Sequence, residues 1–202
     1  MSNVVLESPL AAITGQGPRV LSVDGASVTL GEAAMCDMLN IRGNAADAGL
    51  VQAVQQATGL ALPLAANTAT LGEAGQVLWL GPDEWLLKFP PSGVHYQHPS
   101  SAEAMEATLR SALAGKHVSL VPVGHGFTTL TVQGTGAAAL LARGCPLDFH
   151  PRAIAAGAVA QSHVAKAGAT IVCLAAGTHF ELTVRRSFAD YLYRWLCEAG
   201  AA

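Results

Sequence analysis

The sequence is poor in charged and aromatic side chains, and this scarcity limits the partners that it can have. Only 12% of its 202 residues are Asp, Glu, Lys or Arg and only 5% are aromatic, whereas 51% are hydrophobic. Globular domains usually contain about 25% charged residues, so much of this surface must be neutral. A broad neutral surface is typical of a protein that docks on another protein, but the abundance of Ala and Gly explains the same figures without a partner. Composition leaves both explanations open.

A basic patch and a membrane-spanning segment are both missing. The formal net charge is −3 and the eleven Lys and Arg residues are scattered along the chain, which argues against nucleic acid or anionic lipid as a ligand. The uncharged stretch 48–72 is interrupted by Gln, Pro and Asn residues, so it does not fit a bilayer-spanning helix. The N-terminus has neither a basic segment before Glu7 nor a long apolar core. It lacks the pattern of a signal peptide, and we expect the protein in the cytoplasm.

The cysteines and histidines lack the spacing of a metal or redox site. The four cysteines stand at positions 36, 145, 173 and 197, never as C-x-x-C, which argues against a zinc knuckle or a thioredoxin-type motif. They are typical of small buried hydrophobic residues in a reducing compartment. His95 and His98 lie in the proline-rich loop 90–101 with no third ligand nearby in the sequence. We therefore expect no metal site.

Strands and helices alternate along the chain, which indicates the α+β class. Two alternating apolar runs in residues 21–30 flank Asp24-Gly25, the dipeptide typical of a type I′ hairpin. Further strands are predicted at 77–80, 84–89, 118–121, 128–132, 169–174 and 179–184. Helices are predicted at 44–59, 100–115 and 187–200, because each segment opens with a polar cap followed three residues later by an acid, and ends at Gly. The caps are Asn44, Ser100 and Ser187. A shorter helix is predicted at 136–143.

The last predicted helix carries one apolar stripe. Its members fall at i, i+3, i+4, i+7 and i+8, and they are Phe188, Tyr191, Leu192, Trp195 and Leu196. This spacing places them on one side of a helix. We expect that side to pack inward.

The two halves of the chain echo each other. The strand and helix at 83–89 and 101–113 resemble those at 178–184 and 187–199, and the helix at 45–59 has a counterpart at 134–144. A duplicated domain is predicted from this order. We expect one domain, residues 1–202, with pseudo-duplicated halves of about 1–115 and 116–202.

A thiol, a carboxylate and an imidazole gather in the segment GCPLDFHPR. Cys145, Asp148 and His150 could supply a nucleophile and its base, but Pro146 and Pro151 rigidify this stretch. Alternate side chains of an extended or turning segment also point in opposite directions, and nothing in the sequence stabilises a thiolate here. We therefore interpret the segment as a structural turn in which Asp148 and Arg152 satisfy the backbone or each other, and His150 forms a local hydrogen bond.

Two glycine-rich segments have weak signals of ligand binding. A G-x-G-x-x-A motif at residues 134–139 follows a strand and opens a helix, as in dinucleotide-binding folds. The carboxylate that would hold a ribose is missing, because no Asp or Glu lies between Asp148 and Glu181. His125 stands between two glycines, which favours a tight turn over a ligand site.

Arg185 and Arg186 precede the last helix directly. Such a pair can clamp a carboxylate or a phosphate. It also occurs in solvated turns and in interface contacts, and the sequence leaves these roles open.

Four segments together resemble a known family. Residues 78–87 (LWLGPDEWLL), 143–153 (RGCPLDFHPRA), 161–168 (QSHVAKAG) and 180–196 (FELTVRRSFADYLYRWL) are similar to the gamma subunit of heterotetrameric sarcosine oxidase. The resemblance runs from about Asn40 to the C-terminus, and its last block is the most specific. It implies a fold like the folate-binding domain of the glycine cleavage T protein, with mixed or antiparallel sheets and flanking helices.

The family resemblance also implies a function. Sarcosine oxidase is a four-subunit complex that oxidatively demethylates sarcosine to glycine. Its alpha and beta subunits carry FAD, FMN, NAD and the tetrahydrofolate site, its delta subunit carries zinc, and its gamma subunit has no assigned cofactor. We therefore expect a non-catalytic accessory subunit without catalytic, cofactor-binding or metal-binding residues of its own. The alternatives are a stand-alone folate-binding or aminomethyltransferase-like protein and a redox-sensing thiol protein.

Overall fold

The computed structural model describes residues 7–14, 17–90 and 101–201. The described residues divide into two compact units, one made of 35–90 and 101–125 and the other of 7–14, 17–34 and 126–201. Each unit is an antiparallel sheet with helices packed against it, so the predicted α+β class is confirmed. Within the described segments, no helix is both long and apolar enough to cross a membrane.

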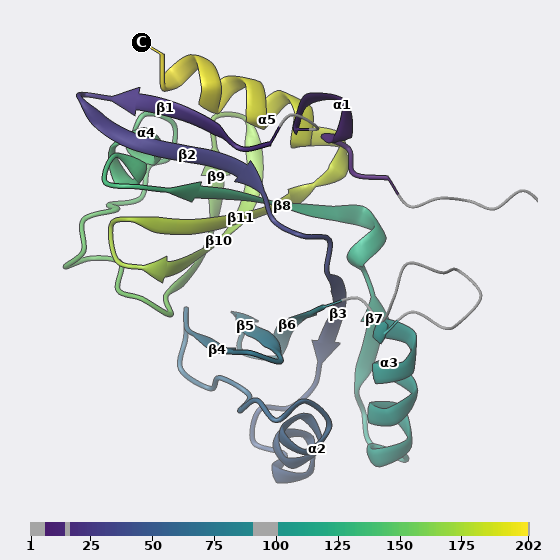
Figure 1. Ribbon diagram of the computed structural model, residues 1–202. Helices are drawn as coiled ribbons and strands as arrows, with labels where there is room; N and C mark the ends of the chain where they lie inside the picture. The colour runs from purple at the N-terminus through teal and green to yellow at the C-terminus, as the bar shows by residue number, and fades with distance from the viewer. Residues whose placement is uncertain (1–6, 15–16, 91–100, 202) are drawn as a thin grey trace, which may run out of the picture. The chain divides into compact units, whose positions relative to one another are not determined.

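The first unit is built on a five-stranded sheet with the order β4-β5-β6-β3-β7. Helices α2 and α3 cover one face of it (Figure 1). Trp85, Leu87 and Phe89 alternate along β6 and point into the core under these helices, as the period of two requires. The buried Trp85 indole N–H donates a hydrogen bond to the Pro63 carbonyl at 2.8 Å. The elements are β3 (Asp37–Arg42), α2 (Ala48–Thr58), β4 (Ala69–Gly72), β5 (Gly75–Gly81), β6 (Glu84–Phe89), α3 (Ser101–Ala112) and β7 (Ser119–Pro122).

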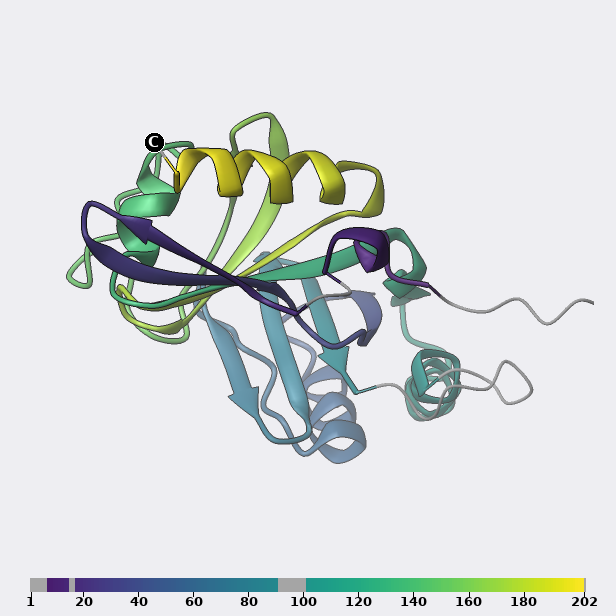
Figure 2. The same ribbon diagram turned by 45° about the horizontal axis from the view of Figure 1, so that its top comes forward.

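The second unit is built on a six-stranded sheet with the order β1-β2-β8-β11-β10-β9. Figure 2 shows α5 running along one face of this sheet, with α4 near its C-terminal end. Asp24 and Gly25 turn the β1–β2 hairpin with φ values of 50° and 81°, as the predicted type I′ turn requires. The elements are α1 (Ala11–Thr14), β1 (Arg19–Val23), β2 (Ala26–Glu32), β8 (Phe127–Gln133), α4 (Ala137–Ala142), β9 (Val159–Val164), β10 (Ala167–Ala175), β11 (His179–Arg185) and α5 (Arg186–Ala199).

The two units share one topology. The series β3-α2-β4-β5-β6-α3 forms the strand order β4-β5-β6-β3, and the series β8-α4-β9-β10-β11-α5 forms the order β9-β10-β11-β8. The segments that echo each other in the sequence occupy the same places in the two series. A duplication with halves of about 1–115 and 116–202 stays a prediction. The compact units are divided differently, because β2 pairs with β8 and β7 pairs with β3.

Each predicted strand overlaps an observed strand, and no predicted end lies more than one residue outside it. The observed strands β3, β4 and β9 were not predicted from the sequence. β3 carries Asp37, Asn40 and Arg42 among its six residues, and β4 has only four residues. Neither segment has a clear period-two pattern in the sequence. Pairing with neighbouring strands, rather than local pattern, makes these segments extended.

Two predicted helix starts are wrong, and one lies outside the described residues. α2 begins after Asp47, whose carboxylate accepts a hydrogen bond from the Gly49 amide at 2.8 Å. The Asn44 side-chain oxygen instead accepts a hydrogen bond from the Ala46 amide, in a turn that precedes the helix. α5 begins after Arg185, not Ser187, because β11 continues directly into the helix. Ser100 is outside the described residues.

The inward stripe predicted for α5 is wrong by one position. The side chains of α5 that enter the core are Ala189, Leu192, Tyr193, Leu196 and Cys197. Phe188 and Tyr191 are 43% and 37% exposed, and Trp195 is half-buried. Both sets have the spacing i, i+3, i+4, i+7, i+8, so helical period alone does not choose between them. The small Ala189 and Cys197 side chains on the buried set allow the helix to approach the sheet closely.

Gly144, directly after α4, packs under the Trp195 ring. A β-carbon on Gly144 would lie 2.2 Å from Cη2 of that ring. We expect Gly144→Ala to lower the free energy of unfolding by about 1–3 kcal/mol, the usual cost of overpacking, as measured by urea denaturation. Gly168→Ala is the matched control, since nothing lies within 4 Å of its added methyl group, and it should change stability by less than about 0.5 kcal/mol. Equal midpoints for the two variants would contradict this account of Gly144.

Candidate functional site

The segment 144–152 does not bring its thiol and imidazole together as a catalytic pair. Cys145 is buried and its Sγ donates to the Ser162 hydroxyl at 3.7 Å. Asp148 and His150 are exposed. The Asp148 carboxylate accepts from the His150 amide at 2.9 Å, and His150 Nδ1 accepts from the Arg152 amide at 3.1 Å. The local hydrogen bonds expected for Asp148 and His150 are therefore present.

Phe149 anchors this turn in the core of the second unit. Its ring is buried and meets the Phe180 ring edge to face, with centroids 5.3 Å apart and an interplanar angle of 85°. Pro151 packs against Gly177, where a β-carbon would lie 3.0 Å from the proline ring. Such packing determines where the polar side chains of the segment point, so the segment has a structural role.

The glycine-rich motif at 134–139 packs against β2. The Gly134 amide donates to the Thr178 carbonyl at 2.8 Å, and the Gly136 amide donates to the Ser27 carbonyl at 3.1 Å. A β-carbon on Gly134 would lie 2.2 Å from that Ser27 oxygen. Phosphate-binding loops need such amides to point at the ligand, but here the chain itself takes them up.

His125 lies in a tight turn, as predicted. It is exposed in the 3₁₀ helix Gly124–Gly126, and the backbone of Gly124 passes close to β3, since a β-carbon there would lie 3.1 Å from the Met38 nitrogen. His95 and His98 are outside the described residues. Within the described ranges, no three His, Cys, Asp or Glu side chains gather as metal ligands.

Three of the four cysteines are buried and all four are free thiols. The expectation that all are buried is wrong for Cys36, which is half-buried. Burial raises the pKa of the Cys173 and Cys197 thiols, so both are protonated at neutral pH. A thiol of this kind is a poor nucleophile.

Arg185 and Arg186 do not form one clamp. The Arg185 guanidinium lies 4.8 Å from the centroid of the Phe127 ring, within cation–π distance. Arg186 donates to the Glu7 carbonyl at 2.5 Å. In the described part of the chain, neither guanidinium forms an ion pair with a carboxylate.

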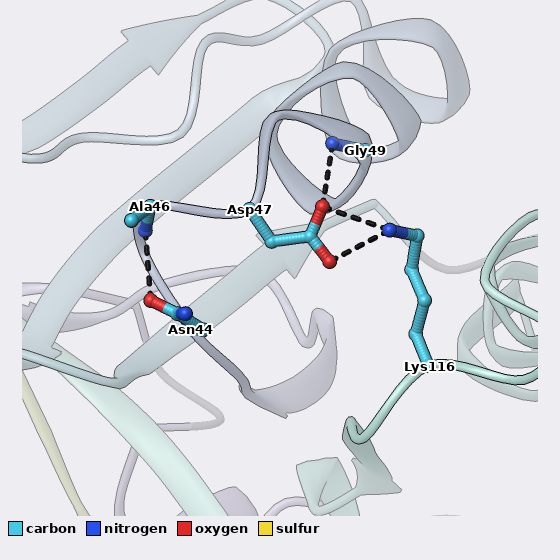
Figure 3. A network of polar contacts seen from close by, with 5 residues as sticks. All are labelled: Asn44, Ala46, Asp47, Gly49 and Lys116. Atoms are coloured by element: carbon cyan, nitrogen blue, oxygen red, sulfur yellow. Dashed lines mark hydrogen bonds and ion pairs between the residues drawn. The ribbon is translucent and has the colours of Figure 1, made fainter.

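Sequence reasoning missed the polar network around Asp47. Lys116 Nζ lies 2.8 Å and 2.7 Å from the two oxygens of this carboxylate, one of which also caps α2 through Gly49 (Figure 3). These hydrogen bonds lower the pKa of Asp47, and the bond from Lys116 has the largest effect. The acid was visible in the sequence as a capping partner, but its lysine lies 69 residues further along. The network joins the start of α2 to the segment after α3.

A second network missed by the sequence holds the N-terminal segment of the second unit. The Glu32 carboxylate accepts from the Ser8 hydroxyl and, at 2.5 Å, from the Thr128 hydroxyl. Ser8 in turn accepts from the Leu10 amide at 2.9 Å, and Leu10 is fully buried in the core. The network therefore positions α1 against the sheet. Its polar side chains, Ser8, Glu32 and Thr128, have a structural role.

Comparison with known proteins assigns the family. The sequence profile of the sarcosine oxidase gamma subunit family matches residues 42–202. This chain belongs to the sarcosine oxidase gamma subunit family. The match confirms the resemblance found in the sequence, which begins at nearly the same residue.

Individual relatives agree with the sarcosine oxidase gamma subunit family. The chain is 29% identical over 174 residues to the sarcosine oxidase subunit gamma of Corynebacterium sp. strain U-96, covering 86% of this chain and 79% of that protein. A chain of the heterotetrameric sarcosine oxidase from Corynebacterium sp. U-96, solved with pyrrole 2-carboxylate, superimposes with a TM-score of 0.81 and 27% identity. That superposition covers 96% of this chain and 94% of the solved one.

The fold also occurs outside the gamma subunit family. The glycine cleavage system aminomethyltransferase T from Bartonella henselae matches with a TM-score of 0.59 and 16% identity, over 96% of this chain and 57% of that protein. At this identity the likeness shows the fold alone, and it confirms the T-protein-like architecture expected from the sequence.

The pair Asp47–Lys116 makes a prediction about acid stability. A carboxylate whose pKa is lowered on folding stabilises the fold above its unfolded pKa of about 3.9, and this contribution is lost as pH falls through the folded value. We expect Lys116→Met to reduce the unfolding free energy at pH 7. The difference from the wild type should shrink as pH falls from about 5 to below the lowered pKa.

Urea denaturation of the two proteins at several pH values measures this difference. Lys116→Arg keeps the positive charge and serves as the control, with a pH profile close to that of the wild type. The interpretation is wrong if Lys116→Met and wild type lose the same free energy between pH 6 and pH 3.

Proposed function

We propose that this chain is the accessory, gamma-type subunit of a heterotetrameric sarcosine oxidase, which oxidatively demethylates sarcosine to glycine. The observation that carries the proposal is the superposition on one chain of such an enzyme over 96% of this chain and 94% of the other. Because the superposition spans nearly the whole of both chains, the similarity extends over the entire subunit and is not limited to one shared module.

We further propose that the chain performs no bond-making step itself. Its reactive residue types already have structural partners: His150 Nδ1 accepts from a backbone amide, and the amides of Gly134 and Gly136 donate to carbonyls. The raised pKa values of Cys173 and Cys197 keep these thiols protonated. These observations support a role in which the chain supplies shape and surface to its neighbours.

The cofactors then belong to the partners. By family resemblance, we propose that alpha and beta subunits carry FAD, FMN, NAD and the tetrahydrofolate site, and that a delta subunit carries zinc. Three buried free thiols support a location in the reducing cytoplasm. A stand-alone folate-binding protein is the competing function, and the T-protein-like fold alone does not favour it because that fold hosts more than one function.

Co-production with the alpha, beta and delta subunits of the same organism tests the assignment. We expect the tagged chain to purify with all three in a fixed ratio, and the chain alone to show no flavin absorbance. Calorimetry of the isolated chain with tetrahydrofolate should show no heat of binding at micromolar concentrations. Folate binding or turnover by the isolated chain would contradict the proposal.

Cys145 provides a separate test of the non-catalytic role. We expect Cys145→Ala to leave turnover of sarcosine by the assembled complex nearly unchanged, because this thiol is buried in the core of the second unit and donates to the Ser162 hydroxyl. Steady-state kinetics measures the effect, and size-exclusion chromatography shows whether the complex is intact. Loss of activity in an intact complex would assign the thiol a catalytic part.

A further inference from the structure

The outer side of α5 presents two aromatic rings away from the core. Phe188 and Tyr191 are 43% and 37% exposed, and three-residue spacing makes them neighbours on the helix surface. Trp195, one turn further along, is half-buried and continues the same line. α5 therefore has one side that enters the core of the second unit and an outer side on which Phe188 and Tyr191 stay exposed, while Trp195 packs against that core.

The start of α5 adds positive charge to this aromatic line. Arg185 and Arg186 stand at the helix N-terminus, where the backbone itself carries partial positive charge, and the first turn contains no acid. Asp190, the nearest carboxylate on the helix, is neutralised by Arg194, whose Nε lies 2.9 Å and 3.0 Å from its two oxygens. The Phe127 ring holds the exposed Arg185 guanidinium in place. The surface is thus aromatic with a basic end.

We propose that Arg185, Phe188 and Tyr191 form the surface through which this chain docks on a larger subunit of sarcosine oxidase. The partner surface that fits them is apolar and bears a carboxylate opposite Arg185. Aromatic residues and arginine are the types most often found at the centre of protein interfaces. This inference rests on the proposed function, because it takes the assembled enzyme as the source of the partner.

A second copy of the chain fits this surface less well. Two-fold pairing brings the same patch of each copy together. If antiparallel α5 helices met with Phe188 of one copy opposite Tyr191 of the other, Arg185 would face Arg194, which is already paired with Asp190, so this contact offers Arg185 no unpaired carboxylate. A parallel pairing would place Arg185 against Arg185. The charge pattern therefore favours a different, acidic partner over self-association.

Binding of the purified chain to the purified alpha and beta subunits, measured by interferometry, tests the surface. We expect Phe188→Ser combined with Tyr191→Ser to weaken the dissociation constant by about tenfold or more, the loss typical of central interface residues. Arg185→Glu should weaken it as well and remove its dependence on salt, whereas Arg185→Lys should bind nearly as the wild type does. Val20→Ser is the matched control, since Val20 is 68% exposed on the edge strand β1 of the same unit.

Hydroxyl-radical footprinting of the wild-type proteins tests the same surface without any substitution, so its result does not depend on how well the variants fold. Hydroxyl-radical labelling of Phe188 and Tyr191 should fall when the wild-type chain enters the complex. Two results would overturn the surface while leaving the proposed function in place: wild-type affinity in all variants with unchanged labelling, or equal weakening by Val20→Ser. A dimer of the chain alone that the same substitutions disperse would also overturn it. Failure of the wild-type chain to bind the subunits would instead overturn the proposed function.

Discussion

The pairing of β2 with β8 is the constraint on which the second unit depends. It joins residues about a hundred positions apart, with Leu30 opposite Val132 and Glu32 opposite Leu130. The same register brings Glu32 to the Thr128 hydroxyl, 96 residues away, and holds the N-terminal segment through Ser8. The pairing costs loop-closure entropy, which burial of both strands in one core offsets.

The residues that suggest chemistry in this chain are used to build the fold. Asp148 and His150 form the hydrogen bonds of a turn. The glycines at 134 and 136 leave room for β2 to pack closely. Asp47 caps α2 and also forms an ion pair with Lys116. These contacts support the proposal that the chain contributes to the enzyme through its surface. The low content of charge is consistent with such a role, and membership of the sarcosine oxidase gamma subunit family supplies the context.

Much of the fold could be predicted because local chemistry decides it. Asp24-Gly25 accepts the left-handed backbone of a tight hairpin, and β11 places the apolar Phe180, Leu182 and Val184 at the period of a strand. Little of the polar site could be predicted in the same way. Whether Asn44 or Asp47 caps α2 depends on which side chain reaches a free amide once the preceding turn has formed.

The sequence by itself determined the α+β class, the type of each long element and the family, since these depend on patterns within a few residues or on whole segments. Only the tertiary structure decided which apolar stripe of α5 faces the core and which partners the Glu32 and Asp47 carboxylates take. The physical reason is distance along the chain. Local preferences act over one or two turns, whereas the rotation of a helix and the Asp47–Lys116 pair depend on atoms contributed from many residues away.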